Sequence, residues 1–219
     1  MSNATRLLPQ LEIELRGRGF DLVVGIDEAG RGPLAGPVVA SAVLLKSFAF
    51  THPVRDSKQL SPLQREKAFA EISHNAHVGI GIIHEDVIDE VNILQATFMA
   101  MHQALRHLVA QLAVDGHGAD QLSDRIFLLI DGNRYRPCEG QNFRHQTVVD
   151  GDAKILSIAC ASIAAKVTRD RMMDAYDKMF PGYGFAGHKG YPTQSHRDAI
   201  RRLGISSIHR KTFQGCALV

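Results

Sequence analysis

Four carboxylates end strand-like segments that lie far apart in this 219-residue sequence. They are Asp27, Glu28, Asp131 and Asp152. Apolar runs at residues 22–26, 126–130 and 147–149 precede them. An acid at the end of a buried strand loses hydration, and several such acids on neighbouring strands repel one another. A hard divalent cation relieves that repulsion, so the pattern indicates metal-assisted chemistry on a phosphate.

The elements that must position these acids alternate between strands and helices. Runs rich in Val and Ile predict strands at residues 22–27, 38–45, 78–83, 126–130 and 145–149. Apolar periodicity and capping residues predict helices that begin at Ser61-Pro62 and cover residues 92–112, 153–180 and 193–203. We expect the first two strands to pair as a hairpin. This order predicts an α/β fold with a mixed central sheet flanked by helices, not a doubly wound repeat.

Composition narrows the class of protein. A chain that is 45% hydrophobic, with no low-complexity tract, predicts one globular domain over residues 1–219. Residues 1–20 would be an N-terminal extension that is helical in part or disordered. No apolar stretch reaches the roughly 18 residues of a membrane span and no signal peptide is evident, so we expect a cytoplasmic protein. The odd count of three cysteines, without C-x-x-C, favours reduced thiols over disulfides or structural zinc.

Basic residues gather near the C-terminal end, although the formal net charge is only +2. Residues 186–219 contain six Lys or Arg and one acid, together with three His. Such an end suits a polyanionic partner such as a nucleic acid. A solvated helix face is the alternative explanation for a run of charge alone.

The glycine-rich segment at residues 27–36 has two interpretations. It matches the loose pattern G-x-G-x-x-A of dinucleotide-binding sites. Two acids at its start, a strand-like run after Pro33 and the lack of a βαβ unit argue against that interpretation. We favour glycines that let backbone N–H groups approach a nucleic-acid backbone or sugar. In isolation the segment would be a simple turn with exposed acids.

The other motifs are weak when taken singly. Asp131-Gly132 is an ordinary turn pair, and Asp152 could be the N-cap of the helix that follows. Lys58 could hold a phosphate or be an exposed turn lysine. Tyr191 could stack on a sugar or base, or pack its own loop.

Together these segments closely resemble ribonuclease HII, the bacterial type 2 ribonuclease H. The matching stretches occur in the family's order over about residues 22–213. They are GIDEAGRGPLAGP at 25–37, DSKQLS at 56–61, IDGN at 130–133, GD at 151–152, ASIAAKVTRD at 161–170 and HKGYP at 188–192.

The resemblance implies a ribonuclease H-like fold and a metal-dependent endoribonuclease. Such an enzyme hydrolyses the RNA strand of RNA/DNA hybrids and cuts 5′ of single ribonucleotides in duplex DNA, leaving 3′-hydroxyl and 5′-phosphate ends. The catalytic, metal-binding set it implies is Asp27, Glu28, Asp131 and Asp152, with two Mg²⁺ or Mn²⁺ ions.

The resemblance also implies how substrate is recognised. Gly30, Arg31 and Gly32 would read the 2′-hydroxyl, largely through backbone groups. Tyr191 would stack on the sugar of the following deoxynucleotide, and Lys58 would contact a phosphate near the scissile one. A monomer without an obligatory protein partner is expected, and no sliding-clamp-binding motif is evident.

One residue departs from the family's pattern. Many members have Lys two residues before the last catalytic acid, where this sequence has Asp150. Asp150 therefore competes with Asp152 for the main ligand role, and motif alignment favours Asp152. Two other functions remain in competition: a nucleic-acid-binding module without turnover, and a nucleotide-cofactor enzyme stabilised by NAD or FAD.

Overall fold

A five-stranded mixed sheet forms the centre of the computed structural model, which describes residues 7–114, 122, 124–138 and 143–216. The strand order is β3-β2-β1-β4-β5. The strands are β1 (Leu22–Ala29), β2 (Val38–Leu45), β3 (Ala76–Ile83), β4 (Ile126–Asp131) and β5 (Arg144–Val148). β2 is antiparallel to β1 and β3, whereas β4 is parallel to both β1 and β5. The predicted mixed sheet is therefore confirmed.

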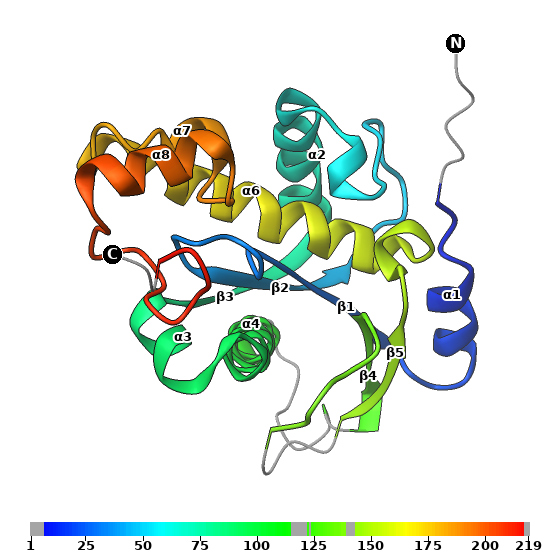
Figure 1. Cartoon of the computed structure of the whole chain (residues 1–219). Coiled ribbons are helices and arrows are strands. Elements are labelled where there is room, and N and C mark those ends of the chain that lie inside the picture. Colours follow the sequence, from blue (N-terminus) through cyan, green and yellow to red (C-terminus); the bar gives the residue numbers. More distant parts are fainter. Residues whose placement is uncertain (1–6, 115–121, 123, 139–142, 217–219) are drawn as a thin grey trace.

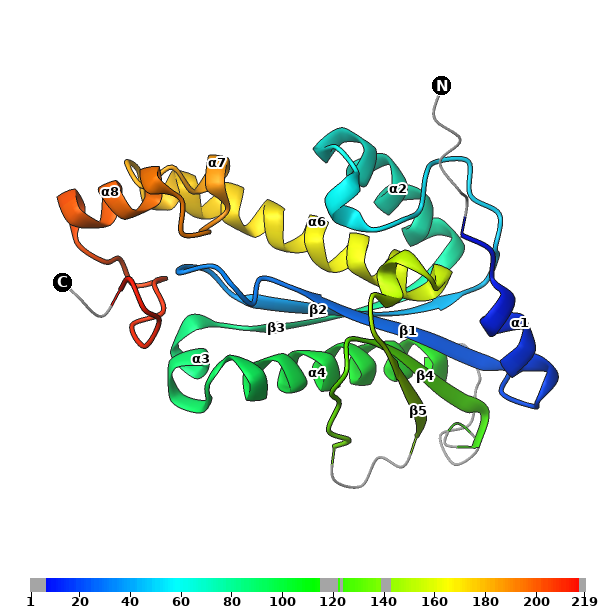
Figure 2. The same ribbon diagram turned by 45° about the vertical axis from the view of Figure 1, so that its right-hand side comes forward.

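Two long helices cover opposite faces of the sheet, α4 (Ile93–Val114) on one side and α6 (Leu156–Met179) on the other (Figure 1). The turned view in Figure 2 shows the same three layers. Alternating side chains of β1 explain this arrangement, since Val24 and Ile26 pack in the core beneath α4 while Val23 packs on the opposite face. Burial of both faces accounts for the nearly continuous apolar runs in the sequence.

Shorter helices surround this frame. They are α1 (Gln10–Gly17), α2 (Pro62–Asn75), α3 (Glu85–Val91), α7 (Phe185–His188) and α8 (Gln194–Leu203), with 3₁₀ turns η1 (Ser57–Gln59) and η2 (Gly151–Ala153). The Ser61 hydroxyl caps α2 in a capping box with Gln64, and Thr193 caps α8. Both predicted helix starts are confirmed.

Two predicted helix boundaries differ from the structure, by one residue at Asn92 and by three at residue 153. Asn92 adopts a left-handed conformation with φ of 71° and separates α3 from α4, and its carboxamide accepts the Leu94 amide at 3.0 Å. The helix expected from residue 153 begins at Leu156 because η2 comes first. Asp152 lies inside η2, so it is not the N-cap of α6.

A glycine in β1 brings α6 close to the sheet. A Cβ on Gly25 would lie 2.2 Å from the carbonyl carbon of Ser157, so a larger residue would push the helix away. Small buried residues along α6, including Ala161 and Ala165, permit the same close contact. This approach places the first half of α6 directly over Asp27, two residues after Gly25.

The segment after β1 does not form a dinucleotide site. The glycine-rich loop leads into β2, which returns antiparallel to β1 as the predicted hairpin, whereas a dinucleotide fold needs a helix there. Cys138, Cys160 and Cys216 are free thiols. Among the helices of the described residues, none is both long and apolar enough to cross a membrane.

Candidate active site

The carboxyl ends of β1 and β4 bring predicted acids together. These strands are parallel with Ile26 opposite Ile130, so Asp27 and Asp131 come next at neighbouring positions. Glu28 follows Asp27 and, by strand alternation, its side chain faces the α4 side of the sheet. Asp27 faces the α6 side, where the hydroxyl of Ser162 bonds to its carboxylate.

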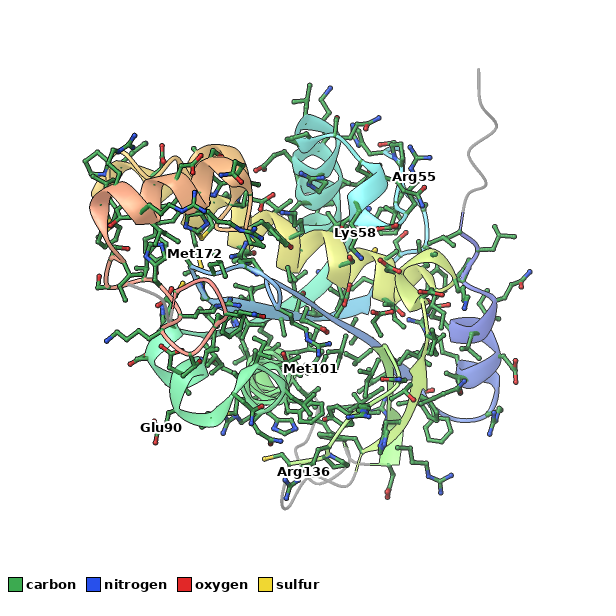
Figure 3. The ribbon with its side chains drawn as sticks, in the orientation of Figure 1. Arg55, Lys58, Glu90, Met101, Arg136 and Met172 are labelled. Carbon is green, nitrogen blue, oxygen red and sulfur yellow. The ribbon has the colours of Figure 1, made fainter. Side chains whose placement is uncertain are left out.

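Asp152 reaches the same region from η2. The Gly151 N–H donates to Oδ1 of Asp131 at 2.7 Å, which ties η2 to the end of β4. Asp152 is buried, and its Oδ2 lies 3.9 Å from Nζ of Lys58, the residue labelled above α6 in Figure 3. Acids that are far apart in sequence therefore lie near the same end of β1 and β4.

Asp150 takes a different position from Asp152. It adopts a left-handed conformation with φ of 54°, is exposed, and has its carboxylate 4.0 Å from the ammonium of Lys154. Asp152 instead contacts Lys58 within the acidic region. This placement favours Asp152 over Asp150 as the fourth member of the acidic set.

Burial and neighbouring charges raise the pKa values of Asp27, Glu28 and Asp152. Burial first, then the charges of Glu28 and Asp131, raise the pKa of Asp27 well above its ordinary value. Burial also raises the pKa of Glu28, although the Arg31 guanidinium opposes it from 3.1 Å. Burial, Asp56 and Asp131 raise the pKa of Asp152.

The same negative charges favour the protonated form of Lys58. Burial lowers its pKa, but the charges of Asp152, Asp56 and Asp27 outweigh that effect, so the pKa of Lys58 is raised. The lysine remains largely exposed, with 82% of its side chain accessible. A single exposed ammonium offsets only a small part of the negative charge.

The donor set suits a hard divalent cation. It consists entirely of carboxylate oxygens, the ligands that Mg²⁺ and Mn²⁺ prefer, and a cation would favour the charged form of Asp27, whose pKa is raised by burial and by the charges of Glu28 and Asp131. As placed, no three His, Cys, Asp or Glu side chains of the described residues converge in metal-binding geometry. Asp131 is bonded to Gly151, Glu28 to Arg31, and Asp152 lies toward Lys58. To bind an ion, these side chains would have to rotate away from their present partners.

The loop between β1 and β2 lies against the acids, and the buried Arg210 side chain holds its backbone in place. Its guanidinium donates to the carbonyls of Gly30 at 2.6 Å, Arg31 at 3.0 Å and Gly36 at 2.7 and 2.9 Å. Arg210 is fully buried, and burial lowers its pKa to about 9. The expectation that the whole basic C-terminal segment faces phosphates is wrong for this residue.

A second buried arginine holds the other side of this loop. Arg169 of α6 donates to the carbonyls of Ala35, Pro37 and Lys189 at 3.1, 2.9 and 3.0 Å. Gly30 has φ of 95°, and a Cβ there would lie 2.1 Å from Nε of Arg169, so the glycine is required for conformation and for space. Neither arginine was assigned this structural role from the sequence, in which Arg169 is one of several cations of its helix, with Lys166 and Arg171 close by.

Tyr191 lies beside the glycine loop. A Cβ on Gly32 would be 3.8 Å from Cε1 of Tyr191, and the Leu34 N–H donates to the carbonyl of Gly190 at 2.8 Å. The Tyr191 ring is 40% exposed, with the Lys166 ammonium 6.0 Å from its centre. The structure thus places the exposed Arg31 and Gly32 beside Tyr191 next to the acids, whereas Gly30 is buried.

Comparison with known proteins agrees with this arrangement. The sequence model of the family described as "Ribonuclease HII" matches residues 24–216. Ribonuclease HII of Geobacter metallireducens is 52% identical over 198 residues, which cover 90% of this chain and 85% of the relative.

Solved structures show the same fold. The crystal structure of ribonuclease H2 from Pyrococcus horikoshii OT3 is 26% identical, with a TM-score of 0.62, and the match covers 90% of this chain and 95% of that one. Bst-RNase HIII in complex with Mn²⁺ is 18% identical, with a TM-score of 0.63, and the match covers 91% and 69% of the two chains. By sequence and by fold, this chain belongs to the ribonuclease HII family and is a ribonuclease H.

Proposed function

We propose that this ribonuclease H cuts the RNA strand of RNA/DNA hybrids and cuts 5′ of single ribonucleotides in duplex DNA, leaving 3′-hydroxyl and 5′-phosphate ends. The observation that carries the proposal is the placement of four acids beside a loop whose backbone is rigidly held. The acids supply the hydrolytic site, and the loop supplies the means of telling RNA from DNA.

In this proposal Asp27, Glu28, Asp131 and Asp152 hold two Mg²⁺ or Mn²⁺ ions. Bound ions would activate a water and neutralise charge on the leaving oxygen. Asp27 is the central ligand, because it lies between Glu28 and Asp131 and has the more strongly raised pKa. Lys58 contacts a phosphate near the scissile bond when Asp152, its partner in this structure, binds a metal ion instead.

Recognition of the ribonucleotide belongs to the glycine loop and Tyr191. Arg210 occupies the carbonyls of Gly30 and Arg31, so we assign the contact with the 2′-hydroxyl to backbone N–H groups of this loop. The half-exposed ring of Tyr191 stacks on the sugar of the next deoxynucleotide. A rigid backbone suits this task, since the discrimination depends on a single hydroxyl.

A basic groove beside the acids extends the contact with a duplex. A cavity of about 660 Å³ lies between α4 and the ends of β4 and β5, and its lining includes Arg134, Arg136 and His145 but no acid. Figure 3 labels Arg136 at this end of the molecule, with Met101 of α4 nearby. We propose that this groove binds phosphates of the duplex, so the affinity for nucleic acid should fall steeply as the salt concentration rises.

The deciding experiment uses a labelled DNA duplex with one embedded ribonucleotide. It is incubated with the protein and Mg²⁺, Mn²⁺ or chelator, beside an all-DNA duplex as control. Cutting immediately 5′ of the ribonucleotide, dependent on metal and absent from the control, would support the proposal. A folded protein that binds the duplex without cutting it would refute it.

Three further expectations complete the proposal. We propose that the enzyme acts as a monomer without an obligatory protein partner, and that it works in the cytoplasm. We also propose that residues 1–219 form a single catalytic domain with residues 1–20 as an extension. Within that extension α1 is helical, and its Glu12 accepts the Ser157 N–H at 2.8 Å.

A further inference from the structure

Three histidines lie directly beneath the loop that carries Tyr191. The rings of His188 and His196 are stacked with centres 4.3 Å apart, and Nε2 of His196 lies 3.1 Å from Nε2 of His209. His196 and His209 are almost completely buried, at 0% and 1% exposed. Sequence analysis had grouped all three with the basic C-terminal surface, which is wrong for the two buried rings.

The hydrogen bonds of His209 determine where its proton lies. The Ser206 N–H points to Nδ1 of His209 at 2.9 Å, and a backbone N–H can only donate. Nδ1 is therefore an acceptor, and the ring of a neutral His209 carries its hydrogen on Nε2. That hydrogen can be donated only to Nε2 of His196, the atom it faces.

The same reasoning continues through His196 to Tyr191. Since Nε2 of His196 accepts, its hydrogen lies on Nδ1, which donates to the carbonyl of Tyr191 at 3.0 Å. The relay Ser206–His209–His196–Tyr191 has one consistent direction, and each ring must be neutral for it to form. His188 is fixed independently, because Nδ1 accepts the Gly190 N–H at 3.1 Å and Nε2 donates to the carbonyl of Tyr183 at 2.9 Å.

The surroundings favour neutral rings. The ring of Phe185 lies 5.5 Å from that of His196 and 5.7 Å from that of His209, and the Tyr183 ring lies 5.2 Å from His209. Within the part of the chain that the structure describes, no acid is paired with any of these rings. Burial and the neighbouring His196 lower the pKa of His209 to about 4, and burial lowers that of His196.

The Tyr191 loop needs this support because its backbone is unusual. Lys189 and Gly190 both adopt left-handed conformations, with φ of 50° and 79°. The conformation of Lys189 is strained for a residue with a side chain. The Tyr191 hydroxyl has no hydrogen-bond partner among the described residues, and the ring has the cations of Arg169 and Lys166 at 5.9 and 6.0 Å, so its position depends on its backbone contacts together with these two side chains. The Tyr191 carbonyl accepts two hydrogen bonds, from the Thr193 N–H at 2.8 Å and from Nδ1 of His196 at 3.0 Å, and the second connects it to the histidine relay.

We propose that His196, held in the Nδ1–H tautomer by His209, is a positioning residue that sets Tyr191 for recognition of the sugar at an RNA-to-DNA junction. This inference rests on the proposed function, because it assumes that Tyr191 contacts that sugar. It adds a residue that touches neither substrate nor metal but controls selectivity between substrates.

A pair of substitutions at His196 tests the inference. In His196→Asn the amide can replace Nδ1 and keep the bond to Tyr191, whereas in His196→Gln the amide reaches the Nε2 position instead. The readout is the ratio of kcat/KM for a duplex with one ribonucleotide to kcat/KM for an uninterrupted RNA/DNA hybrid. We expect His196→Gln to lower this ratio by about five-fold, as one buried hydrogen bond is lost, and His196→Asn to stay within about two-fold of wild type. The ratio measured for Tyr191→Ala gives the reference value for complete loss of the Tyr191 contact.

A matching pair at His209 tests the relay itself. His209→Gln keeps a donor toward His196, and His209→Asn does not. The selectivity of His209→Gln should exceed that of His209→Asn. The control is His107→Gln on the exposed face of α4, where Nδ1 accepts the Ile80 N–H at 3.1 Å far from Tyr191. It should leave the ratio unchanged.

Measurements without substrate separate this inference from the proposed function. Imidazole ¹⁵N spectra of the wild type should show His196 protonated on Nδ1 and His209 on Nε2 at pH 7. Amide exchange at Gly190 and Tyr191 should be faster in His196→Gln than in His196→Asn. If the wild type cuts neither substrate, the proposed function fails, and these two measurements still decide the relay.

Three results would overturn the inference. The first is an opposite tautomer or a charged ring in the spectra at pH 7. The second is unchanged selectivity and loop exchange in His196→Gln. The third is an equal loss in both His196 variants that follows their thermal stability, since that would indicate general destabilisation rather than positioning.

Discussion

The acidic cluster and the recognition loop lie next to each other but are built on opposite principles. In the cluster, buried carboxylates repel one another, and the described residues offer Arg31 and Lys58 as exposed cations nearby. In the recognition loop, meaning residues 30–37 together with residues 188–192, Arg169, Arg210 and His196 donate hydrogen bonds to backbone carbonyls. In the acidic cluster the repulsion between carboxylates stays uncompensated until a cation binds. The recognition loop is instead held in place before any substrate binds. In the function proposed above, the cluster would hold the catalytic ions and the loop would distinguish RNA from DNA.

The strongest test of the comparison is Asp27→Asn. We expect cutting to fall by at least about 10²–10³-fold, the loss seen when one electrostatic group of a catalytic site is removed. Because the pKa of Asp27 is raised, its charge opposes folding at neutral pH, so thermal stability should stay equal or increase. Gel-based cleavage rates and a melting curve measure both effects. Full activity would remove Asp27 from the site.

In the recognition loop, Arg210→Met should lower folding stability, whereas Asp27→Asn in the acidic cluster should not. The substitution leaves the carbonyls of Gly30, Arg31 and Gly36 without their buried donor, which we expect to cost about 3 kcal/mol of folding stability. Urea unfolding measures it, with the exposed Arg201→Met as the matched control. A loss no larger than that of the control would show that the loop does not depend on Arg210.

Divalent metal should stabilise the protein in a pH-dependent way. The raised pKa values of Asp27, Glu28 and Asp152 mean that the native state binds more protons than the unfolded chain above pH 4, so without metal these groups weaken the fold as pH rises through that range. Saturating Mg²⁺ at 100 times its Kd should add about 2.7 kcal/mol. We expect a larger rise in melting temperature at pH 8 than at pH 5, and little in Asp27→Asn. The same rise in that variant would place the ion elsewhere.

A smaller pH effect of opposite sign should come from the histidine relay. The pKa of His209 is about 4 in the native state and near 6.5 when unfolded, so between these values the unfolded state binds the extra proton. Stability should therefore fall as pH drops from 6.5 toward 4. Comparing the slopes of wild type and His209→Gln in urea unfolding isolates this contribution. Parallel slopes would mean that His209 is not the group that titrates.

Much of the frame could be predicted from the sequence because it depends on local pattern. Apolar runs located the five strands, and the capping residues Ser61 and Thr193 located two helix starts. The helix boundaries that were wrong involve conformations with weak sequence signals, the left-handed Asn92 and the 3₁₀ turn around Asp152. Local propensity decides whether an element exists better than it decides where it ends.

The sequence by itself determined the acids at three strand ends, the glycine loop and the resemblance to ribonuclease HII. These follow from residue type and order along the chain. Only the tertiary structure decided that Asp152 is buried near Lys58 whereas Asp150 is exposed beside Lys154, and that Arg169, Arg210 and two histidines are buried against the β1–β2 loop and the Tyr191 segment. A charged side chain far along the sequence carries no local sign of being buried. Its place depends on which backbone carbonyls the fold leaves without a donor, and that is settled when distant segments meet.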